Sequence, residues 1–363
     1  MSLVYHHLVS PGHPAEAVMD FGLFVSCQRL DASGSSRDVY DRALEMVELA
    51  DDAGFRVAWF PEHHLIHYIS CPSPLMLAVK AAARTRRIRM GTAILVIPYY
   101  NPLRLAGEIG MADVLTDGRL EVGVGRGAFE YEFNRFRVTE AIAVQRLREG
   151  MEIVEGLLRN EDFSYTGSTC SFDSATSIPR PLQQPHPPLW IASRSPDTIR
   201  WAVARGYSLL ATPWRDPFER VRTQYETFRK IVAEVQPAKK PRFALSRMTF
   251  VGATDGEALE AMRAIQVNHR IFTRLFRDQA TVRAGFTAPD PVGDEYQPEQ
   301  LLANLVAGSP ETCIEKLRQY EQLGVDQFIV YADFGNERAA TVKSLRRFAE
   351  HVMPHFTRKA TSA

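Results

Sequence analysis

The sequence predicts a single parallel barrel of eight β/α units, the (β/α)8 or TIM barrel. Eight short runs of apolar, β-branched or aromatic residues alternate with longer segments of helical period. Parallel strands need a crossover between them, and strands that are apolar throughout need cover on both faces. Eight such units therefore close most economically into a barrel. The alternative is a doubly wound open sheet, but the first run continues as VSCQRLDASGSS, without the GxGxxG turn typical of that fold.

The predicted strands are all rich in apolar residues. They are FGLFV (21–25), RVAWF (56–60), IRMGTAILVI (88–97), LEVGV (120–124), PLWIAS (188–193), YSLLAT (207–212), FALSRMTFV (243–251) and QFIVYA (327–332). After the first, apolar residues recur at helical spacing from Val39 to Ala50, and Gly54 stands where a helix stop is expected. The same pattern predicts helices near 73–85, 102–116, 140–158, 196–205, 217–235, 255–277, 310–323 and 337–352.

Two segments are too long to be simple connections. Residues 159–187 and 279–309 are rich in proline and glycine, and we interpret both as insertions. The second follows strand seven on the side where barrel enzymes keep their active sites, so we expect it to act as a lid. Residues 1–18 read as an irregular leader, 19–355 as the single barrel domain and 356–363 as a flexible tail.

The balance of charge points to a small-molecule partner. Lys plus Arg and Asp plus Glu both number 43, which argues against nucleic acid or an anionic membrane as the main partner. The four cysteines form no CxxC pair, so we expect a reducing, cytoplasmic compartment. No stretch of about 18 apolar residues occurs, and no signal peptide is recognisable, so a soluble protein is expected.

The motif FPEHHL (60–65) closes the second predicted strand, where barrel enzymes place reactive groups. An imidazole can donate or accept a proton near neutral pH, so Glu62, His63 and His64 are candidate catalytic residues. Because successive strand residues alternate faces, we expect His63 to face the pocket and His64 to point away. A metal site is not expected, because no third ligand accompanies the pair at a telling spacing. The structural alternative is a hydrogen-bonded cluster that packs the barrel rim.

Two further motifs follow the fourth and fifth strands. In GVGRG (123–127), closely spaced glycines let a backbone approach a ligand, and Arg126 can bind a phosphate with two hydrogen bonds. Tight barrel packing also explains these glycines. In SRSPDT (193–198), a helix start, two hydroxyls and Arg194 make a candidate anion site, although helix capping explains Ser195 equally well.

The order and spacing of these motifs resembles the bacterial luciferase-like flavin monooxygenases. The matching strings are DFGLF, WFPEHHL, GTAILVIPYYNP, DGRLEVGVGRG, PLWIAS and GSPETCIEKL. In that family, reduced flavin mononucleotide (FMN) lies across the carboxyl-terminal mouth of the barrel. Oxygen adds at the flavin C4a carbon, and the resulting peroxide attacks the substrate. The resemblance implies the same reaction class here.

The resemblance also implies roles for individual residues. His63 matches a histidine used in acid/base work, and Glu62 matches its neighbour. The Ala93–Ile94 peptide matches one that is cis in the luciferases and supports the flavin ring. The positions expected to bind the cofactor are Phe24, Ala93, Ile94, Arg126, Gly127, Ser193, Arg194, Ser195 and Trp214. Gly125 stands where the luciferase catalytic subunit carries a reactive cysteine, so light emission is not expected.

The leading hypothesis is a monooxygenase that uses O2 and reduced FMN supplied by a separate reductase, because the chain has no recognisable nicotinamide-binding domain. The alternatives are a deazaflavin-dependent hydride-transfer enzyme and a flavin-binding homologue without turnover. The substrate stays open, since residues 272–309 offer both aromatic and basic side chains. The resemblance further predicts self-association, as a homodimer or a higher homo-oligomer, through the exposed faces of helices 73–85 and 102–116.

Overall fold

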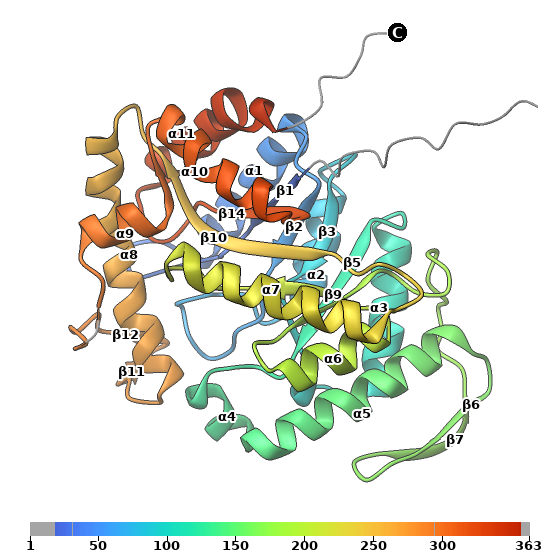
Figure 1. Cartoon of the computed structure of the whole chain (residues 1–363). Coiled ribbons are helices and arrows are strands. Elements are labelled where there is room, and N and C mark those ends of the chain that lie inside the picture. Colours follow the sequence, from blue (N-terminus) through green and yellow to red (C-terminus); the bar gives the residue numbers. More distant parts are fainter. Residues whose placement is uncertain (1–18, 31, 294, 357–363) are drawn as a thin grey trace, which may run out of the picture.

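The computed structural model describes residues 19–30, 32–293 and 295–356 and contains a closed barrel of eight parallel strands, with helices around it (Figure 1). The barrel strands are β1 (Asp20–Phe24), β2 (Val57–Phe60), β3 (Arg89–Thr92), β5 (Leu120–Gly125), β8 (Leu189–Ala192), β9 (Ser208–Ala211), β10 (Phe243–Val251) and β14 (Gln327–Tyr331). Pairing of β9 with β10 closes the ring. The predicted fold is confirmed, and each of the eight predicted runs contains a barrel strand.

One predicted strand is interrupted. Instead of running through 88–97, β3 ends at Thr92, β4 (Leu95–Val96) resumes the pairing with β5, and a short 3-10 turn (Ile97–Tyr99) follows. The peptide bond between Ala93 and Ile94, at the interruption, is cis. This break turns the chain at the carboxyl end of β3, where the barrel opens.

The helices follow the predicted pattern. They are α1 (Ser36–Ala53), α2 (Pro74–Ala82), α3 (Pro102–Leu115), α5 (Glu140–Arg159), α6 (Pro196–Ala204), α7 (Phe218–Val235), α8 (Asp255–Phe276), α10 (Pro310–Leu323) and α11 (Arg338–Arg347). Ser35 caps α1 in a capping box with Asp38, and Gly54 ends it in the left-handed conformation. Beyond α11, a π turn (Phe348–Val352) and a 3-10 turn (Met353–His355) complete the expected last helix.

The long connections contain elements that the sequence pattern did not predict. The first insertion folds into the hairpin β6 (Phe163–Thr166) and β7 (Ser171–Ala175). A short helix, α4 (Glu130–Phe136), follows β5. The second insertion holds the hairpin β11 (Val282–Arg283) and β12 (Phe286–Thr287), then α9 (Pro298–Asn304) and β13 (Val306–Gly308), which pairs with β10. The hairpin strands are at most half buried, so their apolar period is weak.

The expected leader, residues 1–18, and the tail from residue 357 lie outside the described residues. Residue 356 was also assigned to a flexible tail, and this was wrong. Phe356 is buried, and its ring lies 6.1 Å from that of Phe21 in an edge-to-face contact. The barrel core therefore extends one residue further than expected.

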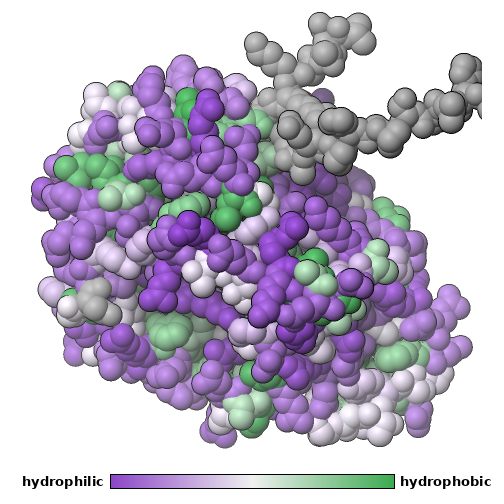
Figure 2. Space-filling model, in the orientation of Figure 1, coloured by the Kyte–Doolittle hydropathy of each residue, from purple (hydrophilic) through white to green (hydrophobic). Residues whose placement is uncertain are grey.

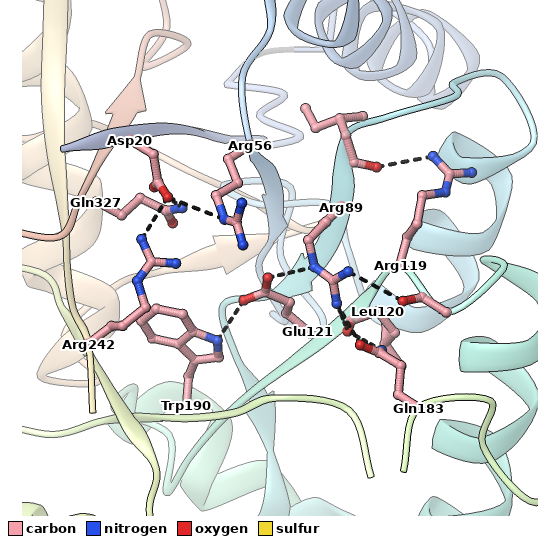
Figure 3. Close-up of polar contacts among 12 residues, drawn as sticks. Asp20, Arg56, Arg89, Arg119, Leu120, Glu121, Gln183, Trp190, Arg242 and Gln327 are labelled. Carbon is pink, nitrogen blue, oxygen red and sulfur yellow. Dashed lines mark hydrogen bonds and ion pairs between the residues drawn. The ribbon is translucent and has the colours of Figure 1, made fainter. Parts of the chain in front are cut away.

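A polar network closes the amino-terminal end of the barrel (Figure 3). Trp59 Nε1 donates to Gln327 Oε1 over 2.8 Å, and Gln327 donates to Asp20 over 2.7 Å. On the other side, Glu121 accepts from Trp190 Nε1 over 2.8 Å and from Arg89 over 2.7 Å. Each of these carboxylates has a guanidinium partner, so the charges at this end of the barrel are balanced.

No helix in the described residues is long and apolar enough to cross a membrane. In the view of Figure 2, hydrophobic residues form small scattered groups among hydrophilic ones. This face of the molecule thus carries no broad apolar area.

The interior leaves no room for a side chain at residue 91. A Cβ added to Gly91 would lie 2.3 Å from Cε3 of Trp59, which is fully buried. Gly91→Ala should therefore lower the free energy of unfolding by about 1 to 3 kcal/mol in chemical denaturation, because overpacking displaces the indole. Gly293→Ala is the control, since nothing lies within 4 Å of a Cβ there. Equal stability of the two variants would contradict this account of the core.

Candidate functional site

The residues selected from the sequence meet at one rim of the barrel. His63 follows β2, Ala93 follows β3, Arg126 follows β5 and Ser193 follows β8. All eight barrel strands are parallel, so their carboxyl ends lie on the same side of the barrel, opposite the polar network of Figure 3. The candidate site is therefore the carboxyl-terminal mouth of the barrel.

His63 lies between an aromatic ring and a buried carboxylate. Its imidazole stacks on Phe129, with ring centroids 4.3 Å apart and planes 22° apart. Nδ1 lies 2.9 Å from Oε1 of Glu132, a residue of α4 that is only 1% exposed. An ionised carboxylate only accepts hydrogen bonds, so Nδ1 donates to Glu132, and Nε2 on the other side of the ring forms no hydrogen bond with a described residue. The arrangement prepares His63 to take up a proton at Nε2.

Glu132 was missed by the sequence analysis. Its carboxylate accepts from Nδ1 of His63 and from the backbone N–H of His64, over 2.9 and 2.8 Å. It belongs to the short helix α4, whose seven residues give no clear apolar period. The available signal was the acidic pair at 130 and 132 directly after the GRG turn at the mouth.

Glu62 and His64 face a different environment from His63. His64 Nε2 donates to Oε1 of Glu62 over 2.8 Å, while Oε2 of Glu62 accepts from the backbone N–H of Val96 and the hydroxyl of Tyr100. Burial alone would lower the pKa of His64, but the hydrogen bond and charge of Glu62, with the charge of Glu132, raise it above its ordinary value. Glu62 thus anchors the turn after β4 and contacts His64. This geometry does not favour the catalytic role beside His63 that the resemblance implied.

The first two glycines of GVGRG, Gly123 and Gly125, are required for close packing against neighbouring segments of the chain. A Cβ at Gly123 would lie 2.1 Å from the Thr92 carbonyl oxygen, and one at Gly125 would lie 2.3 Å from Cδ1 of Ile94. These two glycines let β3 and β5 approach each other, as the structural alternative held. Gly127 adopts φ +85°, the left-handed turn that leads from β5 toward α4.

Arg126 is partly exposed and already has a partner. Its Nη1 lies 2.6 Å from Oε1 of Glu140, in the first turn of α5. The side chains are 39% and 74% exposed, so water weakens the attraction and a stronger anion can replace the carboxylate. Val124 is in register with Ile191, which places Arg126 beside the chain that leaves β8.

The start of α6 lies beside Arg126. Ser195 caps the helix by accepting from the Thr198 N–H, and its own N–H donates to the Ser193 hydroxyl over 3.1 Å. Arg194 donates to the Thr212 carbonyl. Helix starts attract anions because their N–H groups point outward. Asp197 in the first turn opposes this attraction, so the arginines must supply the rest.

Aromatic and apolar side chains line the inner side of the mouth. Phe24 is buried against Tyr331, with ring centroids 4.6 Å apart, and Trp214 meets Phe272 edge to face at 5.0 Å. Ala93 and Ile94 are partly buried beside these rings. The wall thus combines flat rings with small aliphatic groups, as a planar heterocycle requires.

These residues fit FMN. The partly exposed Arg126 and the α6 start suit its phosphate, and the apolar wall suits its ring. The buried donors Trp214 Nε1 and Asn268 Nδ2 have no partner and can serve polar groups of a bound molecule. In the described residues, no group of three or more His, Cys, Asp or Glu side chains could hold a metal ion.

Comparison with known proteins gives one consistent result. The family model for luciferase-like monooxygenases matches residues 19–327. The oxygenase component of the flavin-dependent trigonelline monooxygenase of Acinetobacter baylyi is 32% identical over 348 residues, which cover 93% of this chain and 96% of that protein.

Solved structures share the fold. A monooxygenase from Streptomyces bottropensis gives a TM-score of 0.82 at 24% identity, covering 93% of this chain and 100% of that one. The oxygenating constituent of 3,6-diketocamphane monooxygenase from Pseudomonas putida, in complex with FMN, gives 0.74 at 22% identity, covering 94% and 99%. An F420-dependent secondary alcohol dehydrogenase also gives 0.74, at 17% identity, covering 94% and 100%.

Proposed function

Because this chain belongs to the luciferase-like monooxygenase family, we propose that it is the oxygenase of a two-component system that oxidises a small organic molecule with O2 and reduced FMN. Membership makes it an enzyme. A separate flavin reductase is proposed as the electron donor, in keeping with the words "oxygenase component" in the relative's name. The observation that carries the proposal is the His63–Glu132 pair at the barrel mouth.

The chain's own residues divide the work. Arg126, Gly127 and the segment Ser193–Ser195 would hold the phosphate, and Phe24, Ala93, Ile94 and Trp214 would hold the ring. When bound, reduced flavin supplies the electrons that activate oxygen. His63 would move the proton at Nε2, while Glu132 holds its ring and tautomer, so Glu132 is a positioning residue.

A deazaflavin-dependent reaction is the second candidate, because the F420-dependent dehydrogenase shares the fold. At 17% identity that likeness concerns the fold alone, whereas the oxygenase relative matches at 32% over nearly the whole chain. Spectra of the copurified cofactor separate the two candidates.

We also propose a homodimer and a cytoplasmic location. Exposed apolar side chains occur on α2, on α3 and in the segment 178–182, which contacts α3, and we name them the α2–α3 patch: Met76, Met111, Leu115, Ile178 and Leu182. The four cysteines are free, which suits a reducing compartment. Gly110 of α3 serves a contact within the chain, since a Cβ there would lie 2.2 Å from the Pro179 carbonyl oxygen.

The phosphate site can be tested at Arg126. A charge-assisted contact contributes about 1.5 to 3 kcal/mol, so Arg126→Ala should weaken FMN binding roughly tenfold or more in a fluorescence titration. Glu140→Gln removes the competing carboxylate and should leave FMN binding equal or tighter. Unchanged affinity in Arg126→Ala would remove Arg126 from the site.

The proton-transfer role can be tested at His63. Because general acid/base groups contribute about a hundredfold to ten-thousandfold, His63→Ala should lower substrate oxygenation by that order, raise hydrogen peroxide release and leave FMN affinity nearly unchanged. Glu132→Gln retains an acceptor for Nδ1 and should keep more turnover than Glu132→Ala. His64→Ala should act mainly on stability. Loss of oxygenation in His64→Ala, with His63→Ala intact, would reverse the assignment.

Self-association can be tested at the α2–α3 patch. Met111→Glu places a charge on a side chain that is 54% exposed and should convert a dimer into a monomer of 40.9 kDa in light scattering at micromolar concentration. Ile142→Glu, at a 37% exposed position on α5, should leave the dimer intact. A wild-type monomer would contradict the proposed dimer.

A further inference from the structure

A buried positive charge at the barrel mouth lacks an anionic partner. Arg215, just beyond β9, is 8% exposed, and its Nη1 is buried without a hydrogen bond. No described residue forms an ion pair with it. Its guanidinium lies 5.1 Å from the Phe272 ring centroid and 6.0 Å from that of Trp214. A charge in such surroundings is costly unless a bound anion compensates it.

Arg247 shows how this fold treats a buried structural arginine. It is fully buried, and its Nη1 and Nη2 donate to the carbonyl oxygens of Pro213, Asp216 and Asn304 over 2.7, 2.8 and 2.6 Å. These contacts join the segment after β9 to α9. The side chain of Arg215, by contrast, forms no such hydrogen bonds between segments, so the free energy lost by burying its charge is not offset in this way.

Two more buried donors lie in the same place without acceptors. Asn268 of α8 is fully buried, and its Oδ1 accepts from the Tyr68 hydroxyl over 3.1 Å, which leaves Nδ2 unpartnered. Burial raises the pKa of Tyr68 to about 12, so its hydroxyl stays protonated and donates. Trp214 Nε1 is the other unpartnered donor. A group of hydrogen-bond donors that includes a permanent cation is suited to bind an anionic group with oxygen acceptors, such as a carboxylate.

Aromatic rings join this donor set to His63. The Phe272 ring lies 5.4 Å from that of Phe129, which stacks on His63. Trp214 meets Phe272 edge to face. A narrow crevice lined by Tyr68, Ile271 and Phe286 lies between α8 and the β11–β12 hairpin of the second insertion. Ring contacts through Phe272 and Phe129 thus connect Trp214 to His63.

We propose that Arg215, with Asn268 and Trp214, forms a subsite for a carboxylate of the substrate, so that the enzyme acts on small aromatic carboxylates. The carboxylate would bind the guanidinium, and the aromatic ring would lie against Phe272 and Trp214 toward His63. This inference rests on the proposed function and specifies its substrate class. The guanidinium could otherwise serve the flavin, which is also anionic, so the test must separate these two ligands.

The test uses the full chain and two probes of similar shape, benzoate and its neutral analogue benzamide. Calorimetric titration, with and without bound FMN, should show about tenfold to a hundredfold tighter binding of benzoate. Arg215→Met should abolish this preference, and Arg215→Lys should keep part of it. Arg263→Met on the exposed face of α8 is the control and should bind both probes like the wild type.

Thermal unfolding and FMN titration complete the test. Without ligand, Arg215→Met should be at least as stable as the wild type, because it removes an unpaired buried charge, whereas Arg247→Met should be destabilised. FMN affinity should stay within about twofold in Arg215→Met.

No benzoate preference in the wild type, or a preference that survives Arg215→Met, overturns the subsite. Loss of FMN affinity in Arg215→Met assigns the guanidinium to the flavin and also overturns it. Failure of the wild type to bind FMN would instead refute the proposed function, and the benzoate arm would still decide the subsite.

Discussion

The rest of the structure depends on filling the barrel interior, and the side chain of Trp59 fills a large part of it. Its indole is fully buried, meets Trp190 edge to face at 5.4 Å and donates to Gln327 at the closed end of the barrel. Gly91 on the neighbouring strand provides the space. With the indoles of Trp59 and Trp190 and the balanced charges toward this end, the opposite mouth can hold the reactive groups. The side chains that follow Trp59 on the same strand then reach that mouth.

The end of β2 separates two functions within three residues. Glu62 and His64 turn to one side, where they hold the turn after β4, and His63 turns to the other, where Glu132 and Phe129 hold it. Successive side chains of an extended chain point to opposite sides, and this alternation alone separates His63 from Glu62 and His64. The buried carboxylates therefore play different parts: one stabilises the rim, and the other orients the ring that handles the proton.

Much of this could be predicted from sequence because the evidence was local. The barrel strands are short apolar runs, and caps such as Ser195 and Gly54 carry their own signal. The break in the run 88–97 was not expected as a break, since the apolar pattern continues through it. Glu132 and Asn268 were missed, because each meets its partner across a long stretch of chain: Glu132 contacts His63, and Asn268 contacts Tyr68. Only tertiary structure brings such pairs together.

The contrast between charges at the two ends of the barrel is itself a guide to function. At the closed end, Asp20 and Glu121 are matched by arginines, and the matching explains why these residues are there. At the mouth, only Nδ1 of His63 contacts Glu132, and Nη1 of Arg215 is buried without a hydrogen-bond partner. Folding alone would favour pairing or removing such groups, because buried unpaired polar atoms reduce stability. A bound molecule can supply the missing partners of such groups at the mouth, as a ligand site requires.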